Sequence, residues 1–312
     1  GPPDPYTDSP QENALTAPDL PLGIVHDMPA EEYHAVPALS ATGLKALARS
    51  AWHYKNRPNI KPTRPMLRGT LAHCAVLEPH AMAERYVVVP ADAPRRPSVA
   101  QLNAKKPSDD SRAAMSWWAD FTASAEGRQI VSAEDYAITQ MQLQALADEP
   151  TIAGILKEGH GEVSVFWRCK RTGVYCKARP DWMTPATGRR VTLLDLKSTA
   201  DESPNGFGRA AARMGYHLQR SHYVDGVQQA TGWKVDEFVF AAVTSAPPVL
   251  AVPYFLTDAI KEQADDERAE LMDRYARCME SGHWPAYGQG LQMLDFPAYA
   301  KRDSEVEVSF AD

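Results

Sequence analysis

Short runs of alternating apolar and polar residues fill the segment from Gly161 to about residue 256, a pattern typical of β-strands. The runs GEVSVFWRC and GVYCKARPDWM are separated by KRTG, which predicts a β-hairpin. The next run, VTLLDLKST at 191–199, is apolar at nearly every position and predicts a central strand, buried on both faces. Two further strands are expected around FVFAAVTS and LAVPYFL.

Apolar residues at helical spacing dominate the rest of the chain. Ser40 stands at an N-cap position before a predicted helix at 40–56, and a second helix is expected at 66–79, where Pro79 ends it. A short strand is predicted at 86–90. The remaining helices are expected as two or three between Ser111 and Lys157, one at 216–230 and a long acidic one at 257–281, with a loop at 200–208. This order predicts an α/β or α+β fold in which helices flank a mixed central sheet.

The domain organisation is expected to be simple. Residues 1–22 are rich in Pro and polar residues and predict a disordered N-terminal arm, while 23–312 predict a single domain. Within it, 23–160 is mainly helical with a mobile Pro-rich loop near 90–110, 161–256 holds the sheet, and 257–312 forms a helix and tail. No run approaches about 18 apolar residues and no signal peptide opens the sequence, so we expect a cytoplasmic protein without a membrane segment.

Charge is unevenly distributed. The 312 residues carry a formal net charge of −7, which disfavours a general nucleic-acid binder. The segment from Ser40 to Thr70 nevertheless holds seven basic residues and no acidic one: Lys45, Arg49, Lys55, Arg57, Lys61, Arg64 and Arg68. Such a segment could face a polyanion, although for a basic run by itself a solvated helix face is the favoured explanation. The four cysteines are scattered, form no CxxC pair and are expected to be reduced packing residues.

Two charges interrupt the predicted central strand. Successive side chains of a strand point to opposite faces, so Asp195 and Lys197 share one face and Leu194 and Leu196 the other. An ordinary ion pair at a strand end would explain Asp195 and Lys197 by themselves. Two further acidic residues, Glu162 and Asp181, lie on predicted neighbouring strands, and carboxylates gathered in this way favour Mg²⁺ or Mn²⁺.

The order Glu162, then RPD ending at Asp181, then DLK at 195–197 resembles the core of PD-(D/E)xK nucleases. The surrounding sequence is similar to their phage-type exonuclease branch, the RecE-like (exonuclease VIII) and lambda-exonuclease-like proteins. RGTLAHCAVLEP places His73 in a helix, YHLQRSHYVDG carries the Q-x-x-x-Y pair Gln219 and Tyr223, and SATGLKALARSAWHYKN resembles the N-terminal helix near DNA. The resemblance spans about residues 28–280.

Roles for individual residues follow from this resemblance. It implies a PD-(D/E)xK, restriction-endonuclease-like core, in which Lys197 activates water and Gln219 and Tyr223 position substrate or metal ligands. The implied metal ligands are Asp181, Asp195, Leu196, His73 and Glu162, and Asp181, Asp195 and Glu162 also count among the implied catalytic residues. The implied DNA contacts are Ser40, Lys45, Arg49 and Arg68.

The implied activity is a 5′-to-3′ exonuclease that degrades one strand of linear duplex DNA and leaves 3′ overhangs for recombination. Its expected cofactor is Mg²⁺, replaceable by Mn²⁺, with two ions per site. Its expected partners are double-stranded DNA ends, further copies in a ring of three or four subunits, and a RecT-like or Bet-like single-strand annealing protein. The alternatives are an endonuclease or RecB-like nuclease of the same fold, and a non-catalytic DNA-binding scaffold. An iron–sulfur member is disfavoured because only Cys278 lies near the C-terminal end.

Overall fold

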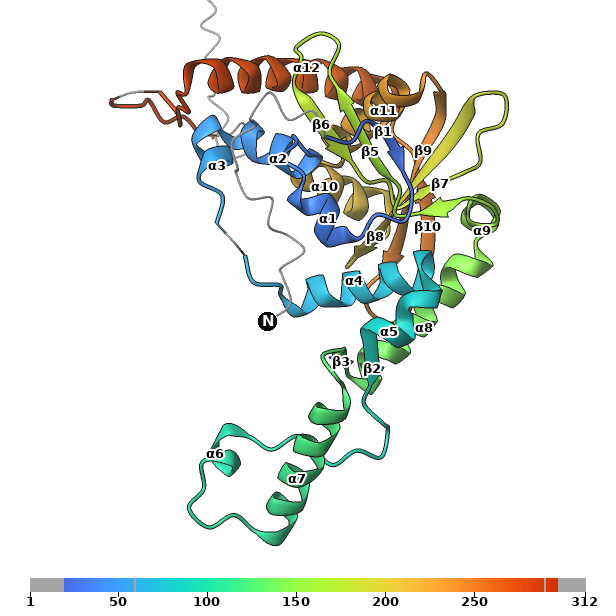
Figure 1. The fold of residues 1–312 in the computed structure, drawn as a ribbon, viewed down its shortest axis with the longest axis vertical. Helices are drawn as coiled ribbons and strands as arrows, with labels where there is room; N and C mark the ends of the chain where they lie inside the picture. The colour runs from blue at the N-terminus through green and yellow to red at the C-terminus, as the bar shows by residue number, and fades with distance from the viewer. Residues whose placement is uncertain (1–19, 59, 289, 297–312) are drawn as a thin grey trace, which may run out of the picture.

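A five-stranded mixed sheet forms the centre of the computed structural model, which describes residues 20–58, 60–288 and 290–296 (Figure 1). The strand order is β10-β9-β8-β7-β4. β8 and β9 run parallel, and the other three pairs are antiparallel. These strands are β4 (His160–Gly161), β7 (Trp182–Met183), β8 (Arg190–Thr199), β9 (Lys234–Thr244) and β10 (Ala251–Tyr254). The predicted central position of the VTLLDLKST strand is therefore confirmed.

Two smaller sheets accompany the central one. The antiparallel sheet β1-β5-β6 contains the predicted hairpin, and β2 and β3 form a parallel pair. The strands are β1 (Gly23–Val25), β5 (Ser164–Arg168), β6 (Tyr175–Ala178), β2 (Tyr86–Val88) and β3 (Gln129–Val131). The hairpin thus lies beside the central sheet, and Asp181 stands between β6 and β7 instead of within a strand.

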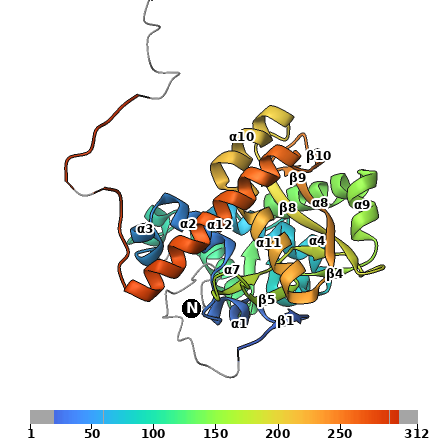
Figure 2. The same cartoon turned by 90° about the horizontal axis from the view of Figure 1, so that it is seen from above.

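Helices cover both faces of the central sheet, with α4, α8 and α9 on one side and α11 and α12 on the other (Figure 1). Seen from above, α12 runs across α2 and α11 (Figure 2). The helices are α1 (Ala30–Ala35), α2 (Ala41–Arg49), α3 (Ala51–Lys55), α4 (Arg64–Leu77), α5 (Met82–Arg85), α6 (Val99–Leu102), α7 (Asp109–Ser124), α8 (Ala133–Asp148), α9 (Pro150–Leu156), α10 (Pro204–Met214), α11 (Tyr216–Thr231) and α12 (Asp258–Ser281). A 3-10 turn, η1 (Pro79–Ala81), follows α4.

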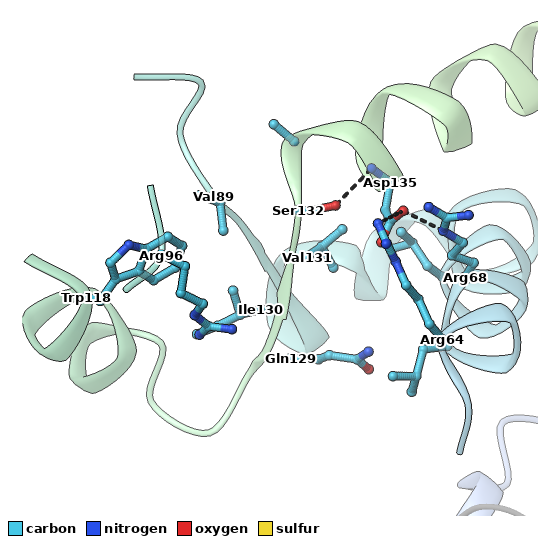
Figure 3. Close-up of a pocket in the computed structure, with 13 residues that line it drawn as sticks. Arg64, Arg68, Val89, Arg96, Trp118, Gln129, Ile130, Val131, Ser132 and Asp135 are labelled. Carbon is cyan, nitrogen blue, oxygen red and sulfur yellow. Dashed lines mark hydrogen bonds and ion pairs between the residues drawn. The ribbon is translucent and has the colours of Figure 1, made fainter. Parts of the chain in front are cut away.

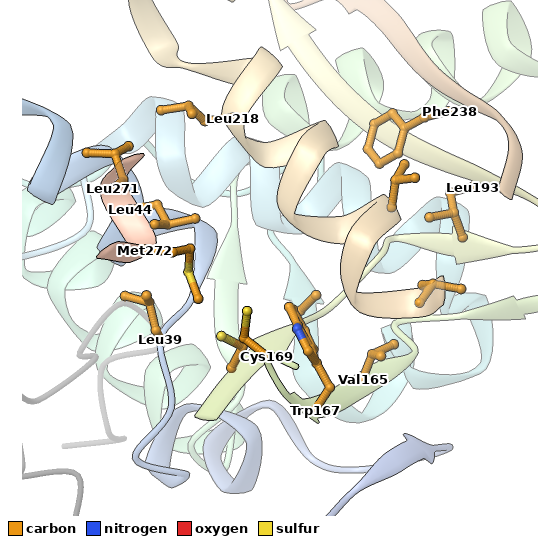
Figure 4. Close-up of a cluster of buried hydrophobic side chains, with 14 of the residues drawn as sticks. Leu39, Leu44, Val165, Trp167, Cys169, Leu193, Leu218, Phe238, Leu271 and Met272 are labelled. Carbon is orange, nitrogen blue, oxygen red and sulfur yellow. The ribbon is translucent and has the colours of Figure 1, made fainter. Parts of the chain in front are cut away.

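Alternation along β8 divides the core in two. Leu193 belongs to the cluster on the α11 side (Figure 4), whereas Leu194 and Leu196 pack with Leu146 of α8 and Ile152 of α9. Burying one such leucine contributes about 1.5–3 kcal/mol to folding. The predicted separation of leucines and charges is confirmed, and it fixes which face of β8 carries Asp195 and Lys197.

Several predicted elements differ in the structure. The helix expected at 40–56 is divided because Ser50 has an extended backbone, and its side chain accepts a hydrogen bond from the N–H of His53 to start α3. Much of the loop expected at 200–208 belongs instead to helix α10. Ser203 is its N-cap, with the hydroxyl accepting a hydrogen bond from the N–H of Gly206, and Pro204 is its first residue, a position that proline often occupies. Strand β3 lies in a region predicted to be helical. The prediction was wrong there because β3 is formed by pairing with β2, which is distant in sequence, and such a pairing leaves no local pattern.

Residues 89–128, which we call the outer arm, project away from the sheet and carry α6 and α7 (Figure 1). The Pro-rich loop expected to be mobile therefore contains one helical turn, α6. A capping box closes its N-terminus: the Ser98 hydroxyl accepts a hydrogen bond from the N–H of Gln101, and the Gln101 side chain accepts one from the N–H of Ser98. The predicted N-terminal arm lies outside the described residues except for 20–22, as does the end of the predicted C-terminal tail. No helix in the part of the chain that the structure describes is long and apolar enough to cross a membrane.

Candidate active site

Strand β8 places Asp195 and Lys197 side by side in an apolar setting. Asp195 is buried, and Lys197 Nζ lies 2.6 Å from its Oδ2. The residues opposite them on β9 are Phe240 and Ala242, which offer no polar side chain. Burial by itself lowers the pKa of Lys197, but the neighbouring charges of Asp195 and Asp181 outweigh it and raise the pKa. Lys197 is consequently a cation at neutral pH, despite its surroundings.

Asp181 approaches the same strand from the loop before β7. Its Oδ2 accepts a hydrogen bond from the backbone N–H of Leu196 at 2.7 Å, and its backbone carbonyl accepts one from the N–H of Glu162 at 2.9 Å. Burial, followed by the charge of Asp195, raises the pKa of Asp181 to about 7. The two aspartates therefore repel each other unless a cation or a proton lies between them.

Glu162 is held in a left-handed backbone conformation, with φ of 51°. Few residues other than glycine adopt this region, and such positions concentrate at functional sites. Its Oε2 accepts a hydrogen bond from Arg179 Nε at 2.8 Å, which fixes the carboxylate. Burial raises the pKa of Glu162, but the hydrogen bond and charge of His73 and the charge of Arg179 lower it further than burial raises it.

His73 reaches the carboxylates from α4. Its Nδ1 lies 3.7 Å from Asp181 Oδ1 and 4.0 Å from Glu162 Oε1. Its Nε2 lies 3.1 Å from the carbonyl oxygen of Leu196, to which it can donate. Burial alone would lower the pKa of His73, but the two carboxylates outweigh it and raise the pKa to about 9. Helix α4 and strand β8 are thereby tied together at the site.

The donor set fits a divalent cation. His73, Glu162 and Asp181 offer ligand atoms that all lie within 4.8 Å of one another. Two ligands about 2.1 Å from one Mg²⁺ are at most about 4.2 Å apart, and the two distances from Nδ1 satisfy this limit. A bond from Nε2–H to a carbonyl is also the usual way in which a metal-binding histidine is oriented. The carbonyl of Leu196 therefore orients the His73 ring by accepting this hydrogen bond. The predicted role of Leu196 as a metal ligand stays a prediction.

Helix α11 supplies the predicted Q-x-x-x-Y pair. Gln219 Nε2 donates a hydrogen bond of 2.8 Å to Asp195 Oδ1, so the amide fixes the carboxylate that also holds Lys197. Tyr223 lies one turn further on and packs edge-on against Phe238. Burial, with the nearby charges of Asp195 and Asp181, raises the pKa of Tyr223 well above its ordinary value. Tyr223 is thus a neutral hydrogen-bonding group at the margin of the site.

The four predicted DNA contacts separate in space. Lys45 lies near Lys197, since its Nζ is 5.5 Å and that of Lys197 is 4.6 Å from the centre of the Tyr216 ring. Ser40 is buried and its hydroxyl accepts a hydrogen bond from the N–H of Gly43, so it caps α2. Arg49 is exposed on α2 and borders a cavity of about 500 Å³ that is also lined by Arg274, Arg277 and His283.

Arg68 points elsewhere, towards the outer arm. It forms an ion pair with Asp135, which Arg64 also contacts, and both arginines line a cavity of about 470 Å³ (Figure 3). Arg96 and Trp118 lie at the other end of the same cavity, with the guanidinium 4.6 Å from a ring centre of the tryptophan. Asp135 therefore neutralises part of the charge of Arg68, and the predicted DNA contact of Arg68 stays a prediction.

Two residues of the site were missed in the sequence. Arg179 holds Glu162, and its position immediately before Pro180 and Asp181 is the only local signal for it. The ammonium groups of Lys45 and Lys197 both lie over the ring of Tyr216. The local sequence signal for Tyr216 is its helical spacing from Gln219.

Comparison with known proteins agrees with this geometry. A family model described as "PDDEXK-like domain of unknown function (DUF3799)" matches residues 40–295. The chain belongs to this family. The predicted PD-(D/E)xK fold is confirmed, since the match includes His73, Glu162, Asp181, Asp195, Lys197 and α11.

Solved structures share the PDDEXK-like fold. Eleven chains match, among them a crystal structure from Eubacterium rectale described as a "Putative exonuclease". The two are 14% identical, with a TM-score of 0.54, and the alignment covers 88% of this chain and 96% of that one. No match was found among the curated proteins with which the chain was compared. At this identity, the likeness concerns the fold.

Proposed function

We propose that this PDDEXK-like chain is a metal-dependent nuclease that hydrolyses phosphodiester bonds. The observation that carries the proposal is the partly buried array on β8, where Asp195 and Lys197 stand beside Asp181 and close to Glu162 and His73. Gathering five charged groups at one partly buried place is costly to folding, and such clusters are typical of sites that act on a charged substrate.

Each group of the array has a chemical task. A bound Mg²⁺ or Mn²⁺, one or two per site, would supply Lewis acidity and lower the pKa of water, and His73, Glu162, Asp181 and Asp195 are the residues that would hold it. Lys197 offers an ammonium next to Asp195, where it can orient the attacking water or offset charge on phosphate. Gln219 keeps Asp195 in place.

DNA is the substrate that the surrounding charges favour. One turn of α2 leads from Lys45 at the site to Arg49, which lies beside Arg274 and Arg277. Cations lined up from a catalytic centre outwards can follow a phosphate backbone, even in a protein of net charge −7.

The finer activity that we propose is a 5′-to-3′ exonuclease on linear duplex DNA, which produces 3′ overhangs for recombination. The support is the PDDEXK-like family together with the Q-x-x-x-Y pair, whose glutamine contacts the catalytic aspartate. A ring of three or four copies and a RecT-like or Bet-like annealing partner belong to the same proposal.

Digestion of labelled DNA tests this function directly. Linear duplex with Mg²⁺ should be degraded from each 5′ end, while closed circular duplex, and any sample with chelator, should stay intact. Cleavage of closed circles would favour an endonuclease of the same fold. Binding of DNA without any cleavage, with Asp195→Asn behaving like the wild type, would favour a non-catalytic scaffold.

A further inference from the structure

A second lysine lies near Lys197, and it comes from a distant part of the chain. Lys45 of α2 has its Nζ 5.5 Å from the centre of the Tyr216 ring, and Lys197 of β8 has its Nζ 4.6 Å from the same centre. Tyr216 begins α11, the helix that also carries Gln219. One aromatic ring therefore supports two ammonium groups from two different elements.

The position of Lys45 is shaped by the junction between α10 and α11. Gly215 stands there with φ of 65°, in the left-handed region that favours glycine. A Cβ at this position would lie 3.2 Å from Lys45 Cγ. The bare glycine leaves room for the lysine stem, while helix α2 is fixed against α11 and α12 by buried residues such as Leu44. The side chain of Lys45 is thus confined, and its ammonium is aimed towards Tyr216.

The two lysines differ in their charged partners. Lys197 is paired with Asp195, whose other oxygen is occupied by Gln219. Among the residues that the structure describes, no ion pair within 4.0 Å is found for Lys45. Burial, and then the charge of Lys197, lower the pKa of Lys45 to about 8, so it still carries a proton at pH 7. The ammonium of Lys45 is therefore available to an anion that binds at this place.

We propose that Lys45 is a second catalytic lysine, which binds a non-bridging oxygen of the phosphate under attack together with Lys197. This role rests on the proposed phosphodiester hydrolysis. Lys45 forms and breaks no covalent bond in it: its ammonium offsets the negative charge that grows on the phosphate oxygens as water adds and the P–O bond to the leaving group breaks.

A competing role for Lys45 is contact with a neighbouring phosphate further along the strand, as expected for Arg49. The two roles differ for a substrate that contains a single phosphate. Bis(p-nitrophenyl) phosphate is such a diester, and its hydrolysis is followed by colour without any DNA. Loss of Lys45 should impair cleavage of this compound only if the lysine touches the reacting phosphate.

The experiment compares Lys45→Met and Lys45→Gln with the wild type, on linear duplex DNA and on bis(p-nitrophenyl) phosphate with Mn²⁺. Both variants should lose about 100- to 1000-fold in kcat/KM on both substrates, most of it in kcat, because one preorganised donor to a transition-state oxygen is removed. Lys45→Arg should recover part of the rate. Lys170→Met, at an exposed lysine in the β5–β6 turn, is the matched control and should behave like the wild type.

Binding of deoxyadenosine 5′-monophosphate with Mg²⁺, measured by calorimetry, provides a readout that needs no turnover. The two neutral variants should bind it about 10-fold more weakly, as expected for loss of one charge-assisted hydrogen bond. Unchanged cleavage of the small diester, or unchanged nucleotide affinity, in a variant with wild-type melting temperature would overturn the role of Lys45. If the wild type binds the nucleotide through Lys45 but cleaves neither substrate, the proposed function fails and the Lys45 contact stands.

Discussion

At the scale of single residues, the site depends on side chains that fix other side chains. Asp195 has one oxygen against Lys197 and the other against Gln219, and Glu162 is fixed by Arg179. Alternation along β8 was enough to predict that Asp195 and Lys197 share a face. The hold of Arg179 on Glu162 was not predictable, because it depends on a left-handed backbone at Glu162 that no local pattern announces.

Gln219→Ala should lower nuclease activity about 10- to 100-fold, because Gln219 orients the carboxylate of Asp195 but does not itself bind metal or substrate in the proposed mechanism. The Mg²⁺ concentration needed for half-maximal activity should rise, and excess Mg²⁺ should restore part of the rate. Gln228→Ala, further along α11 and exposed, is the matched control. An unchanged metal requirement would show that Gln219 is not coupled to the metal ligands.

The stability of the metal-free protein should fall as pH rises from 6 to 9. His73 has a folded pKa of about 9 against an ordinary value of 6.5, so the folded chain holds its proton more tightly. This contribution is fully present below pH 6.5 and is lost as pH rises through 9, on the order of a few kcal/mol. Asp181, with a pKa raised to about 7, acts in the same direction up to that pH.

Melting curves with chelator, recorded across that range, check this pH dependence. Mn²⁺ should raise the melting temperature, and more so at pH 9 than at pH 6, because the ion takes the place of the protons. His73→Gln should flatten the pH dependence. A melting temperature that climbs with pH in the chelated wild type would contradict the assignment.

At the scale of elements, helix α11 must lie close to both β8 and β5 for Gln219 to reach Asp195. Gly226 permits this approach, since a Cβ there would lie 2.5 Å from the indole ring of Trp167. The helix itself was predictable from its period, as was β8. The distance between α11 and β5 was not predictable, because it depends on the contact of Gly226 with Trp167, a residue of another segment.

Gly226→Ala should destabilise the fold by about 1–3 kcal/mol through overpacking, even though alanine favours helices. Gly208→Ala in α10, where nothing lies within 4 Å of the added Cβ, should instead stabilise by about 0.5–1 kcal/mol. Urea unfolding of the two variants gives both values. Equal effects at the two positions would mean that the contact with Trp167 does not limit how closely α11 approaches.

At the scale of the whole molecule, the site joins segments that the sequence keeps far apart. Lys45, His73, Glu162 and Asp195 come from α2, α4, the turn before β5, and β8. The motif order allowed the acidic core to be predicted. The approach of α2 to β8 depends on α11, which packs against α2 and contacts β8 through Gln219 and Asp195, and on α12, which packs against α2 and α11. A single sequence does not reveal this packing.

The proposed ring is also a whole-molecule property. Light scattering on the purified protein should give three or four times the chain mass of 34.4 kDa, and the value should not change with dilution over the micromolar range. Three or four copies would present the Arg49 surfaces around one lumen. A monomeric mass under these conditions would contradict the ring while leaving the nuclease proposal intact.

The outer arm has a consequence for how this protein can be altered. Its two ends enter the body through the short parallel strands β2 and β3, which lie next to each other, and the β8 array draws no residue from 89–128. The arm is therefore a module that can be exchanged. Grafting a different binding domain between Val88 and Gln129 would direct the protein to new targets and leave the proposed hydrolytic site on β8 unchanged.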